Sequence, residues 1–318
     1  MDNFNWKGSE GHLFLLSKFI RAQESKYFYS NQEYWGRILD ESPQKAIKRL
    51  VEEEMLVRPS LDFLVSYKYK VTELKGMLKQ YGMPISGKKD ELTNRIIQTD
   101  KEAMGKLVSE IELLVCTQPG REIAEQYKAS ENEKRTKVEK QVFDYLTQRM
   151  LGEASLLAGS YIDSLMETRG LGKSWKRPSP EFEAGLLKII FNNKPEILSK
   201  LDETRLETLR MGAAMLELLG TNSDTKWLPP NFETGLTIDN DSAARMLLFN
   251  AMSIIHLKQY KDSGLKYVEV LGAPNSCPFC KNIVGKRYAL NEAPTLPNPS
   301  CTHELGCRCV YLPYLEQK

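Results

Sequence analysis

Apolar residues recur every three or four positions along most of this chain, the spacing expected of amphipathic helices. Near the start, GHLFLLSKFIRAQ and NQEYWGRIL both have this spacing. The next such segment, residues 42–58, opens with Ser42 at a helix N-cap and Pro43 at the first helical position. The pattern predicts a mainly α-helical chain with several domains.

Residues 113–127, LLVCTQPGREIAEQY, predict a strand, a turn at Pro119-Gly120 and a helix. Two helices, an apolar exit, a strand and a further helix together resemble a winged helix-turn-helix unit, which we place at residues 1–128. The segment 61–105 stands where the wing of such a unit would be. Whether the 42–58 helix reads DNA or only supports the fold stays open, because three glutamates follow its lysines.

Within that insert, residues 67–100 predict two helices joined by a tight turn. Thr72 is expected to cap the first helix, Gly82 to end it, and Ser86 to cap the second. The order V-T-E-L-K-x-x-L-K-x-x-G-x-P-x-S-G-K-K-x-E-L-x-x-R-I resembles the SAP domain, a small helix-turn-helix module associated with binding double-stranded DNA. The resemblance implies a DNA contact at residues 61–105.

The residues at the start of the second helix also favour a phosphate contact by their chemistry. Backbone N–H groups at a helix N-terminus and lysine side chains both attract phosphate. The alternative is a solvated helix face that binds nothing. The candidate DNA-binding residues are Lys75, Lys79, Ser86, Gly87, Lys88, Lys89 and Arg95.

The middle of the chain predicts helices without a repeat. Residues 129–150 are charged at first and then helical, so we expect a linker helix there. Residues 151–263 predict a helical domain, with glycine- and proline-rich loops at 170–180 and 220–230. His256 lies in an apolar helical stretch and is interpreted as a core or boundary residue.

Five of the six cysteines and one of the three histidines fall within residues 277–309. The strand candidate LKYVEVLG leads into a C-x-x-C turn, and KRYAL completes a hairpin. A C-x-x-C turn directs two sulfurs at one point, as a structural zinc site requires. A redox pair and disulfides are the alternatives. We expect a small β-containing zinc module at 264–318 with one structural zinc ion, and the candidate ligands are Cys277, Cys280, Cys301, His303, Cys307 and Cys309.

Residues 240–314 resemble the C-terminal module of Mu F-like minor head proteins of tailed phages. The resemblance rests on a helix, a strand, C-P-x-C, a proline-rich loop and a closing C-R-C. It implies Cys307 as the third ligand. We interpret Cys301 and His303 as competing for the fourth position and Cys309 as a buried thiol. This chain has CTHELGCRC where that family has His-Pro-x-Cys-Arg-Cys.

Composition narrows the function classes only slightly. The net charge of +2 favours no partner, so local patches must carry any argument for nucleic acid. We expect no signal peptide, no membrane partner and a cytoplasmic location. No constellation of acid, base and nucleophile stands out, because HELGC lacks the second histidine of H-E-x-x-H.

The sequence therefore predicts a non-enzymatic protein that binds double-stranded DNA through its SAP-like part. Its zinc module would supply a docking surface for a protein partner or a second binding surface. The alternative function is a minor head protein of a phage or prophage particle, in which the SAP-like part touches packaged DNA beside other head components.

Overall fold

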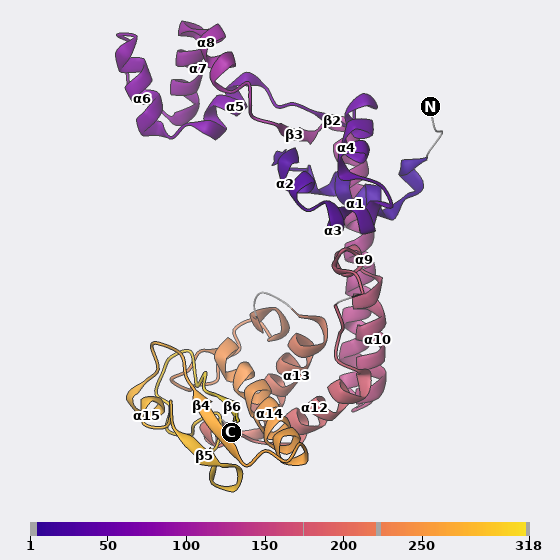
Figure 1. The fold of residues 1–318 in the computed structure, drawn as a ribbon, viewed down its shortest axis with the longest axis vertical. Coiled ribbons are helices and arrows are strands. Elements are labelled where there is room, and N and C mark those ends of the chain that lie inside the picture. The colour runs from indigo at the N-terminus through magenta and orange to yellow at the C-terminus, as the bar shows by residue number, and fades with distance from the viewer. Residues whose placement is uncertain (1–4, 174, 221–223, 316–318) are drawn as a thin grey trace. The chain divides into compact units, whose positions relative to one another are not determined.

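The computed structural model describes residues 5–173, 175–220 and 224–315. Most of these residues are helical, as the sequence predicts, and the described strands form two small three-stranded sheets (Figure 1). The chain divides into two compact units. Unit 1 comprises Met1–Lys134 and Ser164–Trp175, and unit 2 comprises Arg135–Asp163 and Lys176–Lys318.

Unit 1 contains short helices around a small antiparallel sheet with the strand order β1-β3-β2. The Ser42 hydroxyl accepts the Lys45 N–H and Pro43 is the first residue of α4, so the predicted start of that helix is confirmed. Trp6, Phe14, Phe28 and other large side chains fill the core. The elements are η1 Trp6–Gly8, α1 Glu10–Lys18, β1 Gln23–Glu24, α2 Ser25–Ser30, α3 Gln32–Leu39, α4 Pro43–Glu52, β2 Leu56–Val57, β3 Leu113–Cys116, the first part of α9 Gln118–Thr147, and α11 Met166–Leu171.

The strand at 113–116 is confirmed, whereas the turn predicted at Pro119-Gly120 is wrong. Both residues lie in the first turn of α9, because the Thr117 hydroxyl accepts the Gly120 N–H and caps the helix. Gly120 is required here, since an added Cβ would lie 2.1 Å from the Met55 carbonyl oxygen. The glycine thus lets α9 start directly against the chain that leads into β2.

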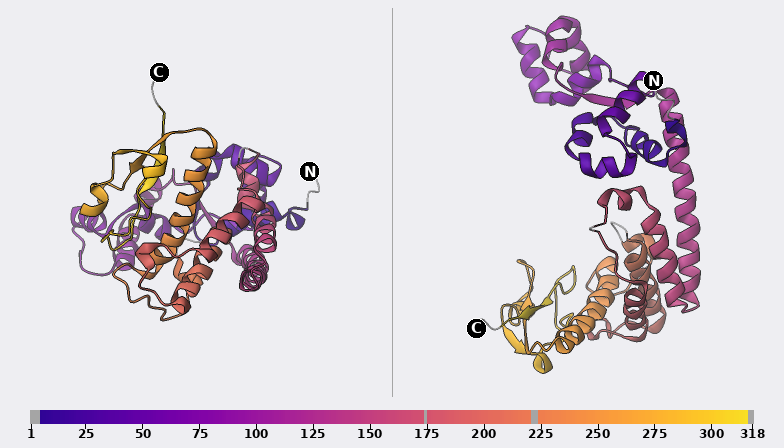
Figure 2. Two further views of the ribbon diagram at one scale, coloured as in Figure 1. Left: turned by 90° about the horizontal axis from the view of Figure 1, so that it is seen from below. Right: turned by 45° about the vertical axis from the view of Figure 1, so that its right-hand side comes forward.

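The segment between β2 and β3 forms a helical bundle with its own core (Figures 1 and 2). Because β2 and β3 pair with each other, the insert leaves and re-enters the small sheet at adjacent points. Leu74, Leu78, Leu92 and Ile96 are fully buried within it. We call this segment the inserted bundle; its helices are α5 Leu61–Lys68, α6 Val71–Gln80, α7 Lys89–Thr99 and α8 Lys101–Leu107.

A partly buried cluster of Glu41, His12 and Arg49 in unit 1 leads to a pH prediction. Burial alone would raise the pKa of Glu41, but hydrogen bonds from Arg49 and His12 hold it at about 2. A carboxyl with a depressed pKa stabilises the fold above its unfolded value of 4.5, and this contribution is lost as the pH falls towards 2. We expect Glu41→Gln to lower the free energy of unfolding by about 2–3 kcal/mol at neutral pH and by much less near pH 2.

Denaturant titrations across this pH range measure the difference. Glu52→Gln is the matched control, because Glu52 is solvent-exposed and pairs with Lys48 four residues earlier. An equal loss of stability in Glu41→Gln at every pH would contradict the prediction.

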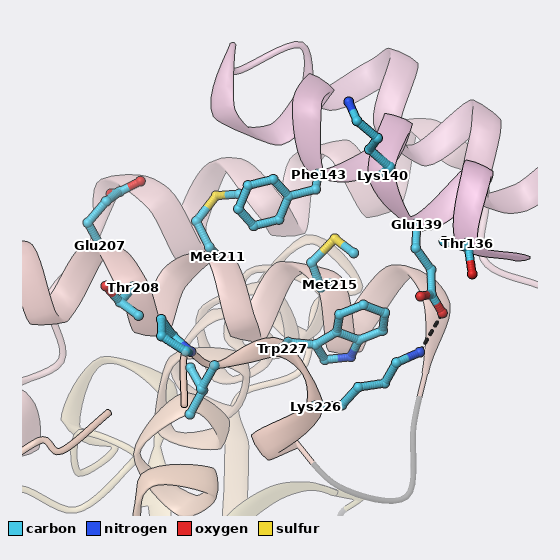
Figure 3. A pocket seen from close by; sticks show the side chains of 12 residues that line it. Thr136, Glu139, Lys140, Phe143, Glu207, Thr208, Met211, Met215, Lys226 and Trp227 are labelled. Carbon is cyan, nitrogen blue, oxygen red and sulfur yellow. Dashed lines mark hydrogen bonds and ion pairs between the residues drawn. The ribbon is translucent and has the colours of Figure 1, made fainter. Parts of the chain in front are cut away.

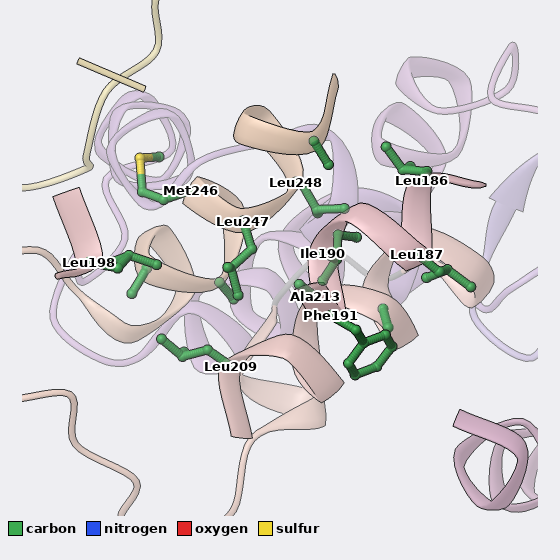
Figure 4. Packing of buried hydrophobic residues seen from close by; sticks show 14 of the residues in the cluster. Leu186, Leu187, Ile190, Phe191, Leu198, Leu209, Ala213, Met246, Leu247 and Leu248 are labelled. Carbon is green, nitrogen blue, oxygen red and sulfur yellow. The ribbon is translucent and has the colours of Figure 1, made fainter. Parts of the chain in front are cut away.

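Unit 2 packs its helices around one apolar core. Leu186, Ile190, Leu209, Ala213 and Leu247 meet in its centre (Figure 4). The elements are the second part of α9, α10 Leu151–Ser164, α12 Pro180–Asn192, η2 Glu196–Leu198, α13 Glu203–Leu219, η3 Asp224–Trp227, α14 Asn240–Asp262, β4 Tyr267–Leu271, α15 Pro278–Lys281, β5 Arg287–Ala289, η4 Leu290–Glu292 and β6 Val310–Tyr314. The cap of α14 is Asp239, whose carboxylate accepts the Ser242 N–H.

The C-terminal sheet confirms the predicted hairpin and adds a strand. β4 pairs antiparallel with β5 as expected, and also with β6 on its other side. Val268, Val270 and Tyr311 from this sheet are buried in the same cluster as the helices of unit 2. Four cysteines of the C-terminal region belong to that cluster too. The helical core therefore anchors the segment that carries the cysteines.

Candidate nucleic-acid interface and metal centre

Both central helices of the inserted bundle start in the same way. The Glu73 carboxylate accepts the Lys70 N–H at 2.6 Å, and the Glu91 carboxylate accepts the Lys88 N–H at 3.2 Å. The helices are therefore capped by a glutamate reaching back three residues. The predicted caps Thr72 and Ser86 are wrong, because α6 starts at Val71 and α7 at Lys89.

This capping changes the expected phosphate site at the start of α7. The first turn of α7 contains Asp90 and Glu91. A Cβ on Gly87 would lie 2.4 Å from a Glu91 carboxylate oxygen, so that carboxylate already occupies the space beneath the glycine. Two acidic side chains oppose an anion at this helix end. The lysine charges, rather than the helix N–H groups, are the better candidates for phosphate contact.

The inserted bundle carries more positive charge than the whole chain. Residues 68–101 hold eight basic and four acidic residues, a net charge of +4 against +2 for all 318 residues. Lys75 and Lys79 stand one turn apart on α6, while Lys88 and Lys89 flank the start of α7. Among the described residues, none of these four lysines forms an ion pair. Their charge is available to an external anion.

Arg95 has a different role from these lysines. Its guanidinium donates to the Pro84 carbonyl at 2.6 Å and to the Ser86 carbonyl at 2.9 Å. It therefore fixes the loop between α6 and α7. Ser86 and Gly87 are exposed in this loop, and Gly87 has a φ of 127°, which favours glycine.

The C-terminal region brings five cysteines together. We call Cys277, Cys280, Cys301, Cys307 and Cys309 the cysteine cluster. Two groups within it lie close enough to hold a metal ion, namely Cys277 with Cys280 and Cys301, and Cys280 with Cys307 and Cys309. Cys280 belongs to both groups, so the two groups are parts of one cluster. All five thiols are free.

Local structure explains how the sulfurs converge. Cys277 is the N-cap of α15, and Pro278 at the first helical position places Cys280 one turn later. The proline-rich loop brings Cys301 to Cys277, with 3.8 Å between their sulfurs. Gly306 has a φ of 66° and turns the chain directly before Cys307. The Cys307 sulfur lies 3.9 Å from the Cys280 sulfur.

Backbone and side-chain donors surround the sulfurs. Asn298, which is nearly buried, donates its backbone N–H to the Cys307 sulfur at 3.1 Å, and its amide nitrogen lies 3.7 Å from the Cys280 sulfur. The Cys307 N–H donates to the Met246 sulfur, which ties the cluster to α14. Asn298 and Met246 are not predictable from the sequence as parts of this site, because neither lies in a motif that identifies it.

The thiols differ in acidity. Burial opposes the ionisation of Cys277, but N–H groups of Thr302 and Cys280 that donate to its sulfur outweigh this effect and hold its pKa at about 6. Hydrogen bonds from Cys301 and Cys309 hold the pKa of Cys307 well below its usual range. Ionising every thiol without a cation would place several negative charges side by side. A divalent cation would offset that repulsion.

Burial and the negative charge of Cys307 raise the pKa of Cys280 to about 11, and the hydrogen bond to Cys307 raises the pKa of Cys301 and Cys309. These three thiols stay protonated in metal-free protein at neutral pH. Metal binding would release protons from those that become ligands.

The remaining ligand candidate, His303, lies outside both cysteine groups. Its Nε2 is 3.0 Å from an Arg308 guanidinium nitrogen and 3.2 Å from the Asn275 amide nitrogen. Its Nδ1 accepts the Leu305 N–H at 3.0 Å. Both ring nitrogens are thus held by protein groups at the edge of the cluster.

A cavity of about 560 Å³ in unit 2 offers little catalytic chemistry (Figure 3). Phe143, Met211 and Trp227 dominate its wall. Its Glu139 is paired with Lys226 at the rim. The residues lining it include neither histidine nor cysteine. None of the helices in the described ranges is long and apolar enough to cross a membrane.

Comparison with known proteins supports one part of the sequence analysis. Residues 68–101 match the family model of the SAP domain, which confirms the resemblance found at 67–100. This match suggests that the segment binds nucleic acid. No curated protein and no solved structure matches the chain. The resemblances to a winged helix and to phage minor head proteins therefore remain predictions.

Proposed function

We propose that this chain is a non-enzymatic protein that binds double-stranded DNA through its SAP segment, residues 68–101, and is stabilised by a structural zinc ion in its cysteine cluster. The DNA part rests on one observation above all. Lys75, Lys79, Lys88 and Lys89 lie in a segment that matches the SAP family and form no ion pair within the part of the chain that the structure describes, and the residues outside this segment are net negative. Such a local concentration of charge favours phosphate contact.

The zinc part rests on the geometry of the sulfurs. Four sulfurs at the usual zinc–sulfur distance of about 2.3 Å stand about 3.8 Å apart around a tetrahedron. The two sulfur pairs of Cys277 with Cys301 and Cys280 with Cys307 are separated by 3.8 and 3.9 Å. Each of these two distances matches one edge of such a tetrahedron, but Cys307 does not belong to the close group of Cys277, Cys280 and Cys301, so zinc binding would have to draw the two pairs together. We assign these four residues as the zinc ligands, with Cys309 as a neighbouring fifth thiol and His303 outside the ligand set.

Other features of the proposal rest on the sequence and the local fold. The β2–β3 pair leads into the SAP segment as a wing would, so we assign unit 1 a winged-helix-like arrangement that carries the bundle. The proposed zinc ion is structural because the four assigned thiolates complete its coordination. A cytoplasmic location fits free thiols that hold a metal.

The salt dependence of DNA binding by the full chain tests the proposed DNA contact. Replacing Lys88 and Lys89 with alanine should weaken binding to all duplexes alike. The log–log slope of affinity against salt concentration should become shallower by about one to two units, because up to two phosphate contacts are lost. Fluorescence titrations at several salt concentrations measure both quantities.

A variant with the same change of net charge controls for long-range effects. Lys45 and Lys48 are exposed lysines of α4, each paired with a glutamate four residues away. The Lys45→Ala/Lys48→Ala variant should bind nearly like the parent. If the two double variants are weakened equally, the SAP segment is not the specific contact.

A further inference from the structure

Three large side chains, at the end of α6 and in the loop that follows it, are partly exposed, and only Tyr81 among them has a polar group, a hydroxyl that donates to the Asp100 carboxylate at 3.1 Å. Tyr81, Met83 and Ile85 are 44%, 37% and 46% exposed. Such a run on a loop differs from scattered single apolar residues, which are normal on protein surfaces. We call these three residues of the SAP segment, Tyr81, Met83 and Ile85, the apolar tip.

The apolar tip has a fixed backbone. The N–H groups of Gly82 and Met83 donate to the carbonyls of Lys79 and Leu78, which closes the end of α6 with a Schellman motif. In that motif the residue in the position of Met83 usually packs onto the helix, yet here more than a third of its side chain stays exposed. The Arg95 guanidinium fixes the other end of the loop through the two carbonyls described above. The tip is therefore prearranged.

Positive charge borders the apolar tip on both sides along the chain. Lys79 precedes it by two residues, and Lys88 and Lys89 follow it within four. An apolar tip with a fixed backbone and lysines on both sides is complementary to a groove of DNA. Lysines contact the phosphates on either side of a groove, while apolar side chains enter it and separate base steps.

We infer that Met83 and Ile85 act as an apolar wedge that enters the minor groove and partly unstacks bases, bending the duplex. This inference rests on the proposed DNA binding and adds the mode of contact. It also accounts for the exposure of side chains that a purely electrostatic contact would not use. Base unstacking is unfavourable, and the burial of the two apolar side chains offsets it.

The test uses the full chain and a duplex containing 2-aminopurine, with donor and acceptor dyes at its two ends. Parent protein should raise the 2-aminopurine fluorescence, which reports unstacking, and the energy transfer, which reports bending. Met83→Ser/Ile85→Ser should abolish both signals and lower the affinity by roughly tenfold. The salt slope should stay unchanged, because the lysines remain. Val51→Ser, a change at a 41% exposed residue of α4, is the matched control and should behave like the parent.

The outcomes separate this inference from the proposed function. If the parent does not bind duplex DNA, the proposed function fails first. If the parent binds without either signal, or the double variant keeps both, the wedge is wrong while DNA binding stands. Tip-dependent binding to vesicles of phosphatidylserine and phosphatidylcholine, with no effect of the tip on DNA, would overturn the wedge in favour of a membrane contact. If the double variant melts at a lower temperature than the parent, the Ile85→Ser single variant replaces it. Loss of the 2-aminopurine and energy-transfer signals in that variant supports the wedge, and their retention overturns it.

Discussion

Removing the metal from purified protein should expose the backbone of residues 272–309 to hydrogen exchange, while the SAP segment keeps its protection. Between β4 and β6 this stretch contains only α15, β5 and η4, all of four residues or fewer. Regular hydrogen bonding therefore orders little of it, and the proposed metal joins its two ends through Cys277 and Cys307. Structural zinc contributes on the order of 10 kcal/mol to the folding of small sites.

The measurement is hydrogen exchange followed by mass spectrometry, before and after treatment with a chelator, together with elemental analysis. The SAP segment serves as an internal control because its buried core is separate from that of unit 2. Added zinc should restore protection. Protein that is purified without metal and shows the same protection at 272–309 would refute a structural zinc site.

The sequence predicted the helices well because most carry a strong apolar period and recognisable ends. Ser42 and Pro43 are one example, since their cap geometry depends only on neighbouring residues. The errors at Thr72 and Ser86 have a common cause. A hydroxyl was favoured as the cap, whereas the glutamates at 73 and 91 cap the helices from inside. Lys-x-x-Glu before an apolar run is a signal that could have located both helix starts.

The candidate sites were predictable to different degrees. The clustering of cysteines in the sequence indicated a metal site, because C-x-x-C spacing is local. The position of His303 depended on contacts with Asn275 and Arg308, which sequence spacing does not give. The role of Asn298 beside the sulfurs likewise depends on how the proline-rich loop folds back. Long-range loop geometry therefore limited the prediction of the ligand set.

The assigned ligand set leads to the last prediction, a comparison of two equal substitutions. Cys280 and Cys309 are both 2% exposed, so replacing either with serine places the same hydroxyl in an equally buried position. Cys280 belongs to both groups of close sulfurs and to the assigned tetrahedron, whereas Cys309 belongs to only one group. Cys280→Ser should reduce zinc from about one ion per chain to almost none. Its zinc affinity should fall by more than roughly 100-fold, since changes to outer-shell partners alone cost about 10–100-fold.

Cys309→Ser should keep about one zinc per chain, with a melting temperature close to that of the parent, because the four assigned thiolates remain. Zinc content and competition with a chromogenic chelator distinguish the two variants. Cys301→Ser completes the comparison and should behave like Cys280→Ser, since the Cys301 sulfur lies one tetrahedral edge from Cys277. If Cys309→Ser loses the metal and Cys301→Ser retains it, the fourth ligand is Cys309. The sulfur distances would then describe the metal-free arrangement, and the proline-rich loop would have to shift when zinc binds.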